Sequence, residues 1–152
     1  MVKDLPISKV YEALSALADN RVKQESTTKY LITSSDYSKT YTVIKNNEAS
    51  YSSNDNATYW QHYSGYPIIA VLLFTERIKA DATLLTYFKG INWKQLNTKN
   101  KNKYDLSIKE AFQDKSLAVQ QEIITETARI KNEVLALNLE VKGNRLPLLN
   151  IK

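Results

Sequence analysis

The chain contains no cysteine and only one histidine, His62. Without cysteine it can form neither a disulfide, nor a thiolate metal site, nor a thiol nucleophile. Three glycines, at positions 65, 90 and 143, are too few and too far apart to form a glycine-rich phosphate loop. A chain of 152 residues buries roughly 70% of its unfolded surface. It therefore needs no disulfide or structural metal to fold.

Long hydrophobic runs are also lacking. The longest apolar run covers residues 66–74, less than half of the ~20 residues that a membrane-spanning helix needs. The first ten residues, MVKDLPISKV, contain no apolar stretch of the length found in a signal peptide. We therefore expect a cytoplasmic protein with no membrane partner.

The charge balance does not identify a partner by itself. The chain carries 21 Lys and Arg against 16 Asp and Glu, a net charge of +5. This excess suits an acidic partner such as nucleic acid, yet a charge of this size is also common in proteins that bind none.

The first third of the chain has the pattern of one helix followed by short strands. In residues 8–18, Val10, Leu14 and Leu17 recur at the spacing of a helical face. Residues 21–53 then form short segments rich in β-branched and aromatic residues, separated by turn signals such as TT, SSDYS and NN. This pattern predicts a three- or four-stranded antiparallel meander.

The remainder of the chain has a helical period. Pro67 opens an apolar run at a position that favours the first turn of a helix. Shorter helices are predicted over 81–89 and 107–113, and one long helix over 115–141. The fold class predicted is thus a single α+β domain: an N-terminal helix, the meander, then a helical C-terminal half with one long helix. The apolar tail LPLLNIK has to dock on the domain or wait for a partner.

Residues 40–74 resemble the SWIM-type zinc-binding module. The segment KTYTVIKNNEASYSS corresponds to two strands, and GYPIIAVLL to the start of a helix with that family's typical I-x-A-V-L run. The resemblance places a C-x-C pair at Ser53 and Asp55 and a C-x-H pair at Gly65 and Pro67, and none of these is cysteine or histidine. It therefore implies a metal-free form of the module, and we expect no metal or other cofactor.

Aromatic side chains gather where that family would hold zinc. They are Tyr51, Tyr59, Trp60, Tyr63 and Tyr66. Each can bury about 150–250 Å² while its polar group reaches a partner. We expect them to fill the space of the lost metal, with Trp60 or Tyr59 as a buried packing anchor.

No constellation of catalytic residues is evident. His62 stands alone, and a Ser-His-Asp site would have to combine it with Ser64 and Asp55 without any elbow motif. A structural histidine is the simpler interpretation. We therefore predict no catalytic residue and no enzymatic activity.

One segment combines basic and aromatic residues. Its members are Trp93, Lys94, Lys99, Lys101, Lys103 and Tyr104. Lysines interleaved with aromatic rings suit single-stranded nucleic acid, because the bases stack and the phosphates pair with lysine. The alternative is a solvated loop rich in lysine.

The predicted long helix carries an apolar seam with a 4-3 spacing. Its interface candidates are Ile123, Ile130, Val134, Leu137 and Val141. Such a seam packs on another helix, either within the chain or in a homodimer. We therefore predict a binding or adaptor module, which either binds nucleic acid through residues 93–104 or associates with protein, including a second copy, through the long helix and tail.

Overall fold

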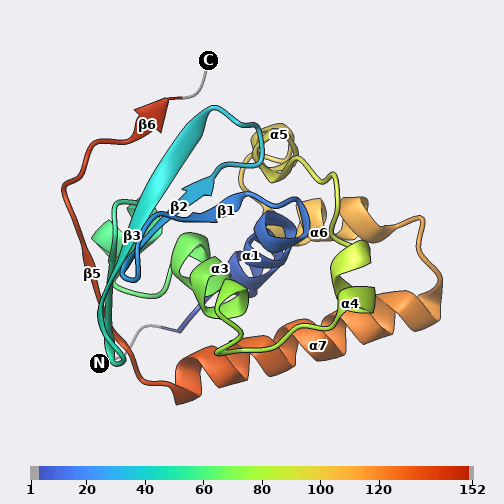
Figure 1. Ribbon diagram of the computed structural model, residues 1–152. Helices are drawn as coiled ribbons and strands as arrows, with labels where there is room; N and C mark the ends of the chain where they lie inside the picture. The colour runs from blue at the N-terminus through green and yellow to red at the C-terminus, as the bar shows by residue number, and fades with distance from the viewer. Residues whose placement is uncertain (1–3, 151–152) are drawn as a thin grey trace.

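A sheet and two layers of helices make up the computed structural model, which describes residues 4–150 (Figure 1). The middle layer is formed by α1 (Ile7–Ala18) and α3 (Tyr66–Phe74). The long helix α7 (Leu117–Ala136) lies against α1, and α3 contacts the sheet. The predicted α+β class is confirmed, with the first helix at the centre of the fold.

Four consecutive antiparallel strands form the predicted meander. They are β1 (Val22–Gln24), β2 (Lys29–Thr33), β3 (Lys39–Asn47) and β4 (Ser50–Ser53). Two later strands extend the sheet: β5 (Glu140–Gly143) runs parallel to β4, and β6 (Leu149–Asn150) runs antiparallel to β3. The segment between them returns along the sheet, where the side-chain amide of Asn54 donates to the carbonyl of Leu146 at 2.9 Å. The tail therefore docks on the domain up to residue 150, and its last two residues lie outside the described range.

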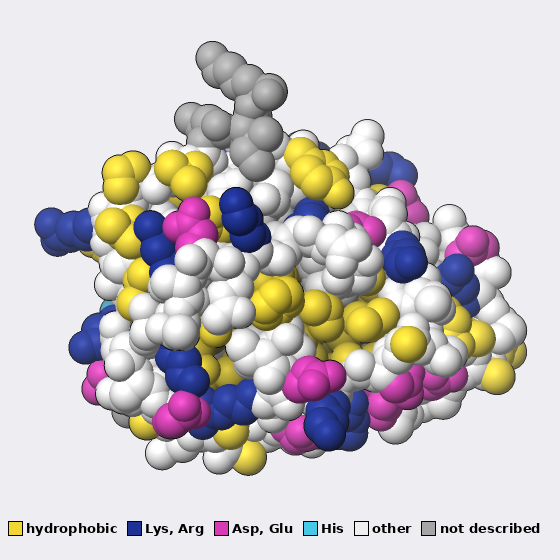
Figure 2. All heavy atoms as spheres, viewed as in Figure 1, with side chains coloured by type: hydrophobic (Ala, Val, Ile, Leu, Met, Phe, Trp, Pro, Cys, Tyr) yellow, Lys and Arg dark blue, Asp and Glu magenta, His cyan; other side chains and the backbone are white. Residues whose placement is uncertain are grey.

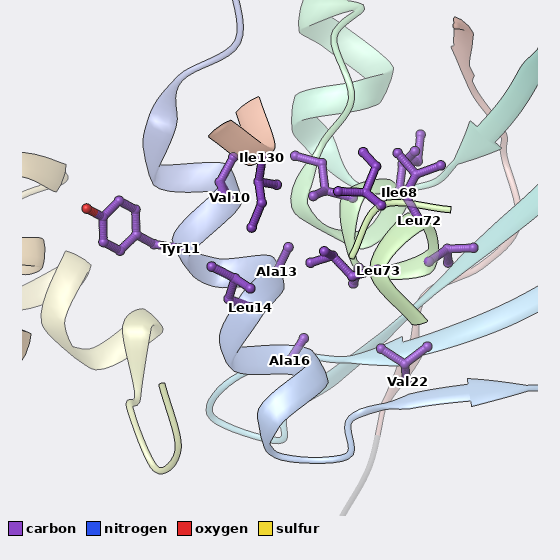
Figure 3. Close-up of a cluster of buried hydrophobic side chains, with 14 of the residues drawn as sticks. Val10, Tyr11, Ala13, Leu14, Ala16, Val22, Ile68, Leu72, Leu73 and Ile130 are labelled. Atoms are coloured by element: carbon purple, nitrogen blue, oxygen red, sulfur yellow. The ribbon is translucent and has the colours of Figure 1, made fainter. Parts of the chain in front are cut away.

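The core lies where the helices meet. Every side chain of α3 from Pro67 to Leu73 is buried, as its uniformly apolar sequence predicts. Figure 3 shows Ile68 and Leu73 of α3 converging with Val10 and Ala13 of α1 and with Ile130 of α7. Burying each large aliphatic side chain contributes about 1.5–3 kcal/mol, so this junction supplies much of the stability.

Four shorter helices complete the fold. They are α2 (Asn56–Gln61), α4 (Ala82–Thr86), α5 (Trp93–Lys99) and α6 (Tyr104–Phe112). Figure 1 shows α6 on the side of α1 that faces away from α3. There a second cluster joins the rings of Tyr11, Phe88, Trp93 and Phe112, whose centroids lie 5.2–6.2 Å apart.

The two tryptophans are placed opposite to expectation. Trp93 is 2% exposed, and its indole N–H donates to the Ser15 hydroxyl at 2.7 Å. Trp60 is 67% exposed and contacts Tyr59 edge-on. The prediction that Trp60 or Tyr59 is a buried packing anchor is therefore wrong for Trp60, whereas Tyr59 is half-buried. The six-residue helix α2 lies at the surface and buries only Thr58.

The long helix is shorter than the sequence period indicates. It ends at Ala136, and Asn138 then takes a left-handed conformation with φ of 49°, as asparagine does after helix ends. Val141 lies on β5, opposite Tyr51 of β4. Pairing with the open edge of β4 satisfies backbone groups that a longer helix would leave uncovered. The prediction of a helix to residue 141 is wrong for this reason.

The seam of α7 is internal. Ile123, Ile130 and Val134 are buried within the chain itself, and the hydroxyl of Thr127 on the same face lies 3.4 Å from that of Tyr11. The prediction that these three residues form an oligomer interface is therefore wrong, because they already pack on the chain's own α1. At 20 residues the helix is about 30 Å long, which a domain of this size can cover.

Candidate functional site

A polar pocket opens beside α1. Its volume is about 330 Å³, near the lower end of the ~300–1,000 Å³ usual for ligand sites. Its walls come from α1, the turn between α1 and β1, the turn between β2 and β3, the start of α2, α5 and the start of α6. Segments from nearly the whole first two-thirds of the chain thus meet around one cavity.

Three side chains that line this pocket, each from a separate element, carry buried polar atoms without a hydrogen bond to any described residue. Arg21, in the turn after α1, is 4% exposed, and its Nη1 donates to the carbonyl of Thr33 at 2.7 Å. Its Nε and Nη2 make no hydrogen bond with any described residue, and nor do Oε2 of Glu12 on α1 and Oδ1 of Asn97 on α5. Asn97 is 9% exposed. All three residues line the same cavity.

Such atoms are costly to bury without a partner. A buried donor or acceptor left unpaired costs about 1–3 kcal/mol, and more when the group is charged. Most buried polar atoms in folded proteins therefore have a partner. Only five buried side-chain atoms of the described residues lack one, and four of these belong to residues that line this pocket. This concentration makes the pocket the candidate site.

The charges in the pocket act on one another. The Nζ of Lys9 lies 3.6 Å from Oε2 of Glu12, one helical turn along α1. Burial raises the pKa of Glu12, and the opposing effects of Lys9 and Arg21 do not cancel it. Burial lowers the pKa of Lys9, but Glu12 and nearby tyrosines outweigh it and hold that pKa above its ordinary value. Burial also raises the pKa of Tyr66, at the pocket wall, well above its usual range.

Asp55 forms a rigid part of the wall. Its carboxylate caps α2 by accepting from the backbone N–H of Thr58 at 3.1 Å, and it accepts from the hydroxyl of Ser53 as well. The N–H of Gly65 donates to the Thr58 hydroxyl at 3.0 Å. A Cβ atom at Gly65 would collide with the Asp55 carboxylate, so only glycine fits there.

These contacts join three of the four positions that the SWIM resemblance singles out: Ser53, Asp55 and Gly65. Hydrogen bonds tie the strand end to the helix start at this point. Across residues 4–150, no three histidine or acidic side chains come close enough together to hold a metal ion. The resemblance itself stays a prediction.

The predicted nucleic-acid segment divides between the pocket and the surface. Trp93, Lys94 and Tyr104 line the pocket, with the Nζ of Lys9 5.3 Å from the Tyr104 ring centroid. Because Trp93 is buried in the core, its ring offers no surface on which a base could stack, and the prediction is wrong for that residue. Lys101 and Lys103 of the same segment lie at the surface.

Lys101 and Lys103 are exposed in the turn before α6, whereas Lys99 forms an ion pair of 2.8 Å with Glu110. Figure 2 shows basic and acidic side chains mixed over the face in view, without a broad region of one charge. His62 is exposed at the end of α2 with φ of 60°. It lines a separate, smaller cavity together with Ser64, and Asp55 is not part of that cavity.

Sequence reasoning missed Glu12, Arg21 and Asn97. One signal was present: Glu12 is the only acidic residue of α1, set between Tyr11 and Ala13 in an otherwise apolar stretch. A charge inside an apolar run indicates either a paired structural residue or a site. Arg21 and Asn97 carry no comparable signal, because each stands among ordinary polar neighbours in the sequence.

Within residues 4–150, none of the helices is both long enough and apolar enough to cross a bilayer.

Comparison with known proteins places the chain in a family. A family model described as uncharacterised conserved protein UCP014422 matches residues 2–140. No curated protein and no solved structure matches the chain. The matched region includes every residue that lines the pocket and extends over all seven helices of the described structure. The chain therefore belongs to this uncharacterised family.

Proposed function

We propose that this protein is a non-enzymatic binding module that takes up a small polar molecule in the pocket beside α1. One observation carries the proposal: four buried polar atoms of Glu12, Arg21 and Asn97 have no hydrogen-bond partner among residues 4–150, and these three side chains line a single cavity of about 330 Å³. A ligand with matching groups offsets the cost of burying them.

The supports of these side chains favour a preformed site. Glu12 and Asn97 project from helices, and Arg21 is held by its bond to the carbonyl of Thr33 on β2. Groups fixed on regular elements keep their geometry without the ligand, so little ordering free energy is lost on binding. Side chains on a flexible surface loop would first have to be ordered, which costs free energy on binding.

A second candidate function keeps the nucleic-acid proposal. Lys94, Lys101 and Lys103 are exposed beside the pocket, next to the half-buried ring of Tyr104. A single strand could place phosphates on these lysines and a base on Tyr104. The burial of Trp93 leaves this surface with one ring instead of two, so we rank it below the pocket.

A screen of small polar metabolites by thermal shift, followed by calorimetric titration, tests the first function. Wild type is compared with Glu12→Gln, which removes a pocket charge, and with Glu122→Gln, a control on α7 away from the pocket. We expect at least one compound to raise Tm and bind wild type and Glu122→Gln alike, but to bind Glu12→Gln more weakly.

The same titrations separate the two candidates. If no metabolite binds, or if Glu12→Gln binds all of them as wild type does, the pocket function is refuted. Binding of single-stranded RNA or DNA that weakens steeply with salt, and that a combined replacement of Lys101 and Lys103 by glutamine reduces, would favour the second candidate.

A further inference from the structure

We propose that the ligand is a small organic oxyanion, a carboxylate or phosphate compound that also carries hydroxyl or amino groups, and that Arg21 holds its acid group. This inference rests on the proposed binding function and adds the chemical class of the ligand. It follows from which atoms are unpaired, how they are arranged and how much room surrounds them.

Arg21 offers the geometry that an oxyanion requires. Its Nη1 is committed to the carbonyl of Thr33, which leaves Nε and Nη2 unpaired. The N–H groups of these two atoms form one side of the planar guanidinium and match two oxygens of a carboxylate or phosphate. Oδ2 of Asp19 forms an ion pair of 3.8 Å with Nε, which is too long for a hydrogen bond.

The other charges of the lining also favour an anion. Lys9, Arg21 and Lys94 contribute three positive charges, whereas Glu12 and Asp55 contribute two negative ones. Both oxygens of Asp55 already accept hydrogen bonds from its neighbours. The balance of these lining charges is therefore positive by one.

The remaining unpaired atoms require hydrogen-bond donors. Oε2 of an ionised Glu12 and Oδ1 of Asn97 can only accept, so an anion without N–H or O–H groups would leave them unpaired. Hydroxyl or amino groups on the ligand supply what is missing. An inorganic anion without O–H groups, such as sulfate, satisfies Arg21 alone.

The size of the pocket limits the ligand. The volume of about 330 Å³ lies near the lower end of the range found for ligand sites. A compact metabolite fits this space, and a folded polymer segment does not. The acid group lies at the buried guanidinium, and Lys94 and Tyr104 remain for the outer part of the ligand.

Calorimetric titration with matched pairs of compounds tests the inference. One arm compares hydroxy and amino carboxylates with their neutral amides, a second compares sugar phosphates with the free sugars, and sulfate, which has no O–H group, is titrated alone. We expect the acid member of at least one pair to bind about tenfold or more tightly than its neutral partner, the range of one charge-assisted hydrogen bond. The arm that responds distinguishes a carboxylate from a phosphate ligand.

Variants locate the acid group. Arg21→Lys keeps the charge without the paired N–H groups, and Arg21→Met removes both. We expect a partial loss of affinity in the first and a loss of about tenfold or more in the second, with Arg145→Lys, on the surface beside Tyr59, unchanged. Should the Arg21 variants fail to fold, Lys94→Gln at the exposed side of the pocket replaces them and should weaken acid ligands but not neutral ones.

Each other outcome overturns a defined part of the account. Tight binding of neutral compounds, with the acid group making no difference, overturns the oxyanion inference and leaves the binding function standing. Sulfate that binds as tightly as any organic compound overturns the role of Glu12 and Asn97. If nothing binds at all, the proposed function fails and the inference fails with it.

Discussion

The two faces of α1 differ in how their side chains are paired. On one face, Val10, Ala13 and Leu14 are fully buried against α3 and α7. On the other, Lys9 and Glu12 line a pocket that contains unpaired buried atoms. Adjacent residues of one helix thus lie in a closed core and in an open polar cavity. A face that serves only stability pairs its groups, whereas unpaired groups indicate a face that serves binding.

The closed face should be far more sensitive to substitution, and Ile130 on α7 tests this most strongly. Ile130→Glu places a carboxylate in the junction with α1, where it finds neither water nor a partner, so we expect a loss above about 4 kcal/mol or complete unfolding. Ile124→Glu on the exposed side of the same helix is the control and should change the free energy of unfolding by less than ~0.5 kcal/mol. Urea unfolding followed by circular dichroism measures both. A folded, stable Ile130→Glu chain would mean that α7 does not close the core.

The two tryptophans extend the comparison to the aromatic side chains. Trp93→Ala should cost about 3–5 kcal/mol, because it empties a site between Tyr11 and Phe112 and leaves the Ser15 hydroxyl without its donor. Trp60→Ala should cost less than ~0.5 kcal/mol. Thermal unfolding of the two variants ranks them. The reverse order would show that α2 is covered by another part of the protein or by a partner.

The pocket wall should resist substitution at one position. Gly65→Ala forces the Asp55 carboxylate or the backbone to move, and we expect a cost of about 1–3 kcal/mol, as for other overpacked sites. Gly65→Ala combined with Asp55→Ala relieves the collision, so a double-mutant cycle should show that the two changes are not additive. Additive losses would place the two residues farther apart than the structure has them.

The smallest effect concerns Glu12 and pH. Burial raises its pKa above the ordinary value of 4.5, so the folded chain binds this proton more tightly than the unfolded chain does. The contribution of Glu12 to the free energy of unfolding therefore falls as pH rises from below that value. Glu12→Gln cannot titrate, so its stability relative to wild type should increase between about pH 4 and pH 7. Urea titrations at both pH values measure the difference, in which the other titrating groups largely cancel. A difference that is constant or decreases would show that Lys9 and Arg21 fully compensate the burial of Glu12.

The sequence predicts those helices and strands whose hydrophobic residues recur with a clear helical or strand period. Residues 8–18, the meander and the run after Pro67 are predicted because helix, strand and buried-helix periods are each distinct there. The end of α7 is not predicted, since Val141 leaves the helical pattern only to pair with β4, ninety residues earlier in the chain. The burial of Trp93 and the exposure of Trp60 are not predicted, because the burial of a ring depends on which distant elements cover it.

The candidate site could be predicted only in part. Lys94 and Tyr104 are marked by the alternation of basic and aromatic residues, and both line the pocket. Glu12 is visible as a charge within an apolar helix, but its neighbours in space are not. Arg21 and Asn97 become notable only through their burial, which depends on the docking of α5 against α1 and the sheet.

A high-resolution crystal structure of the protein soaked with the tightest-binding compound of the metabolite screen tests the central claim most directly. The account predicts that the ligand lies beside α1, with an oxygen pair at Nε and Nη2 of Arg21 and donor groups at Oε2 of Glu12 and Oδ1 of Asn97. A structure in which ordered water bonds to all four atoms while the compound sits elsewhere would contradict it. These atoms would then belong to a hydrated interior, and the pocket beside α1 would not be the binding site.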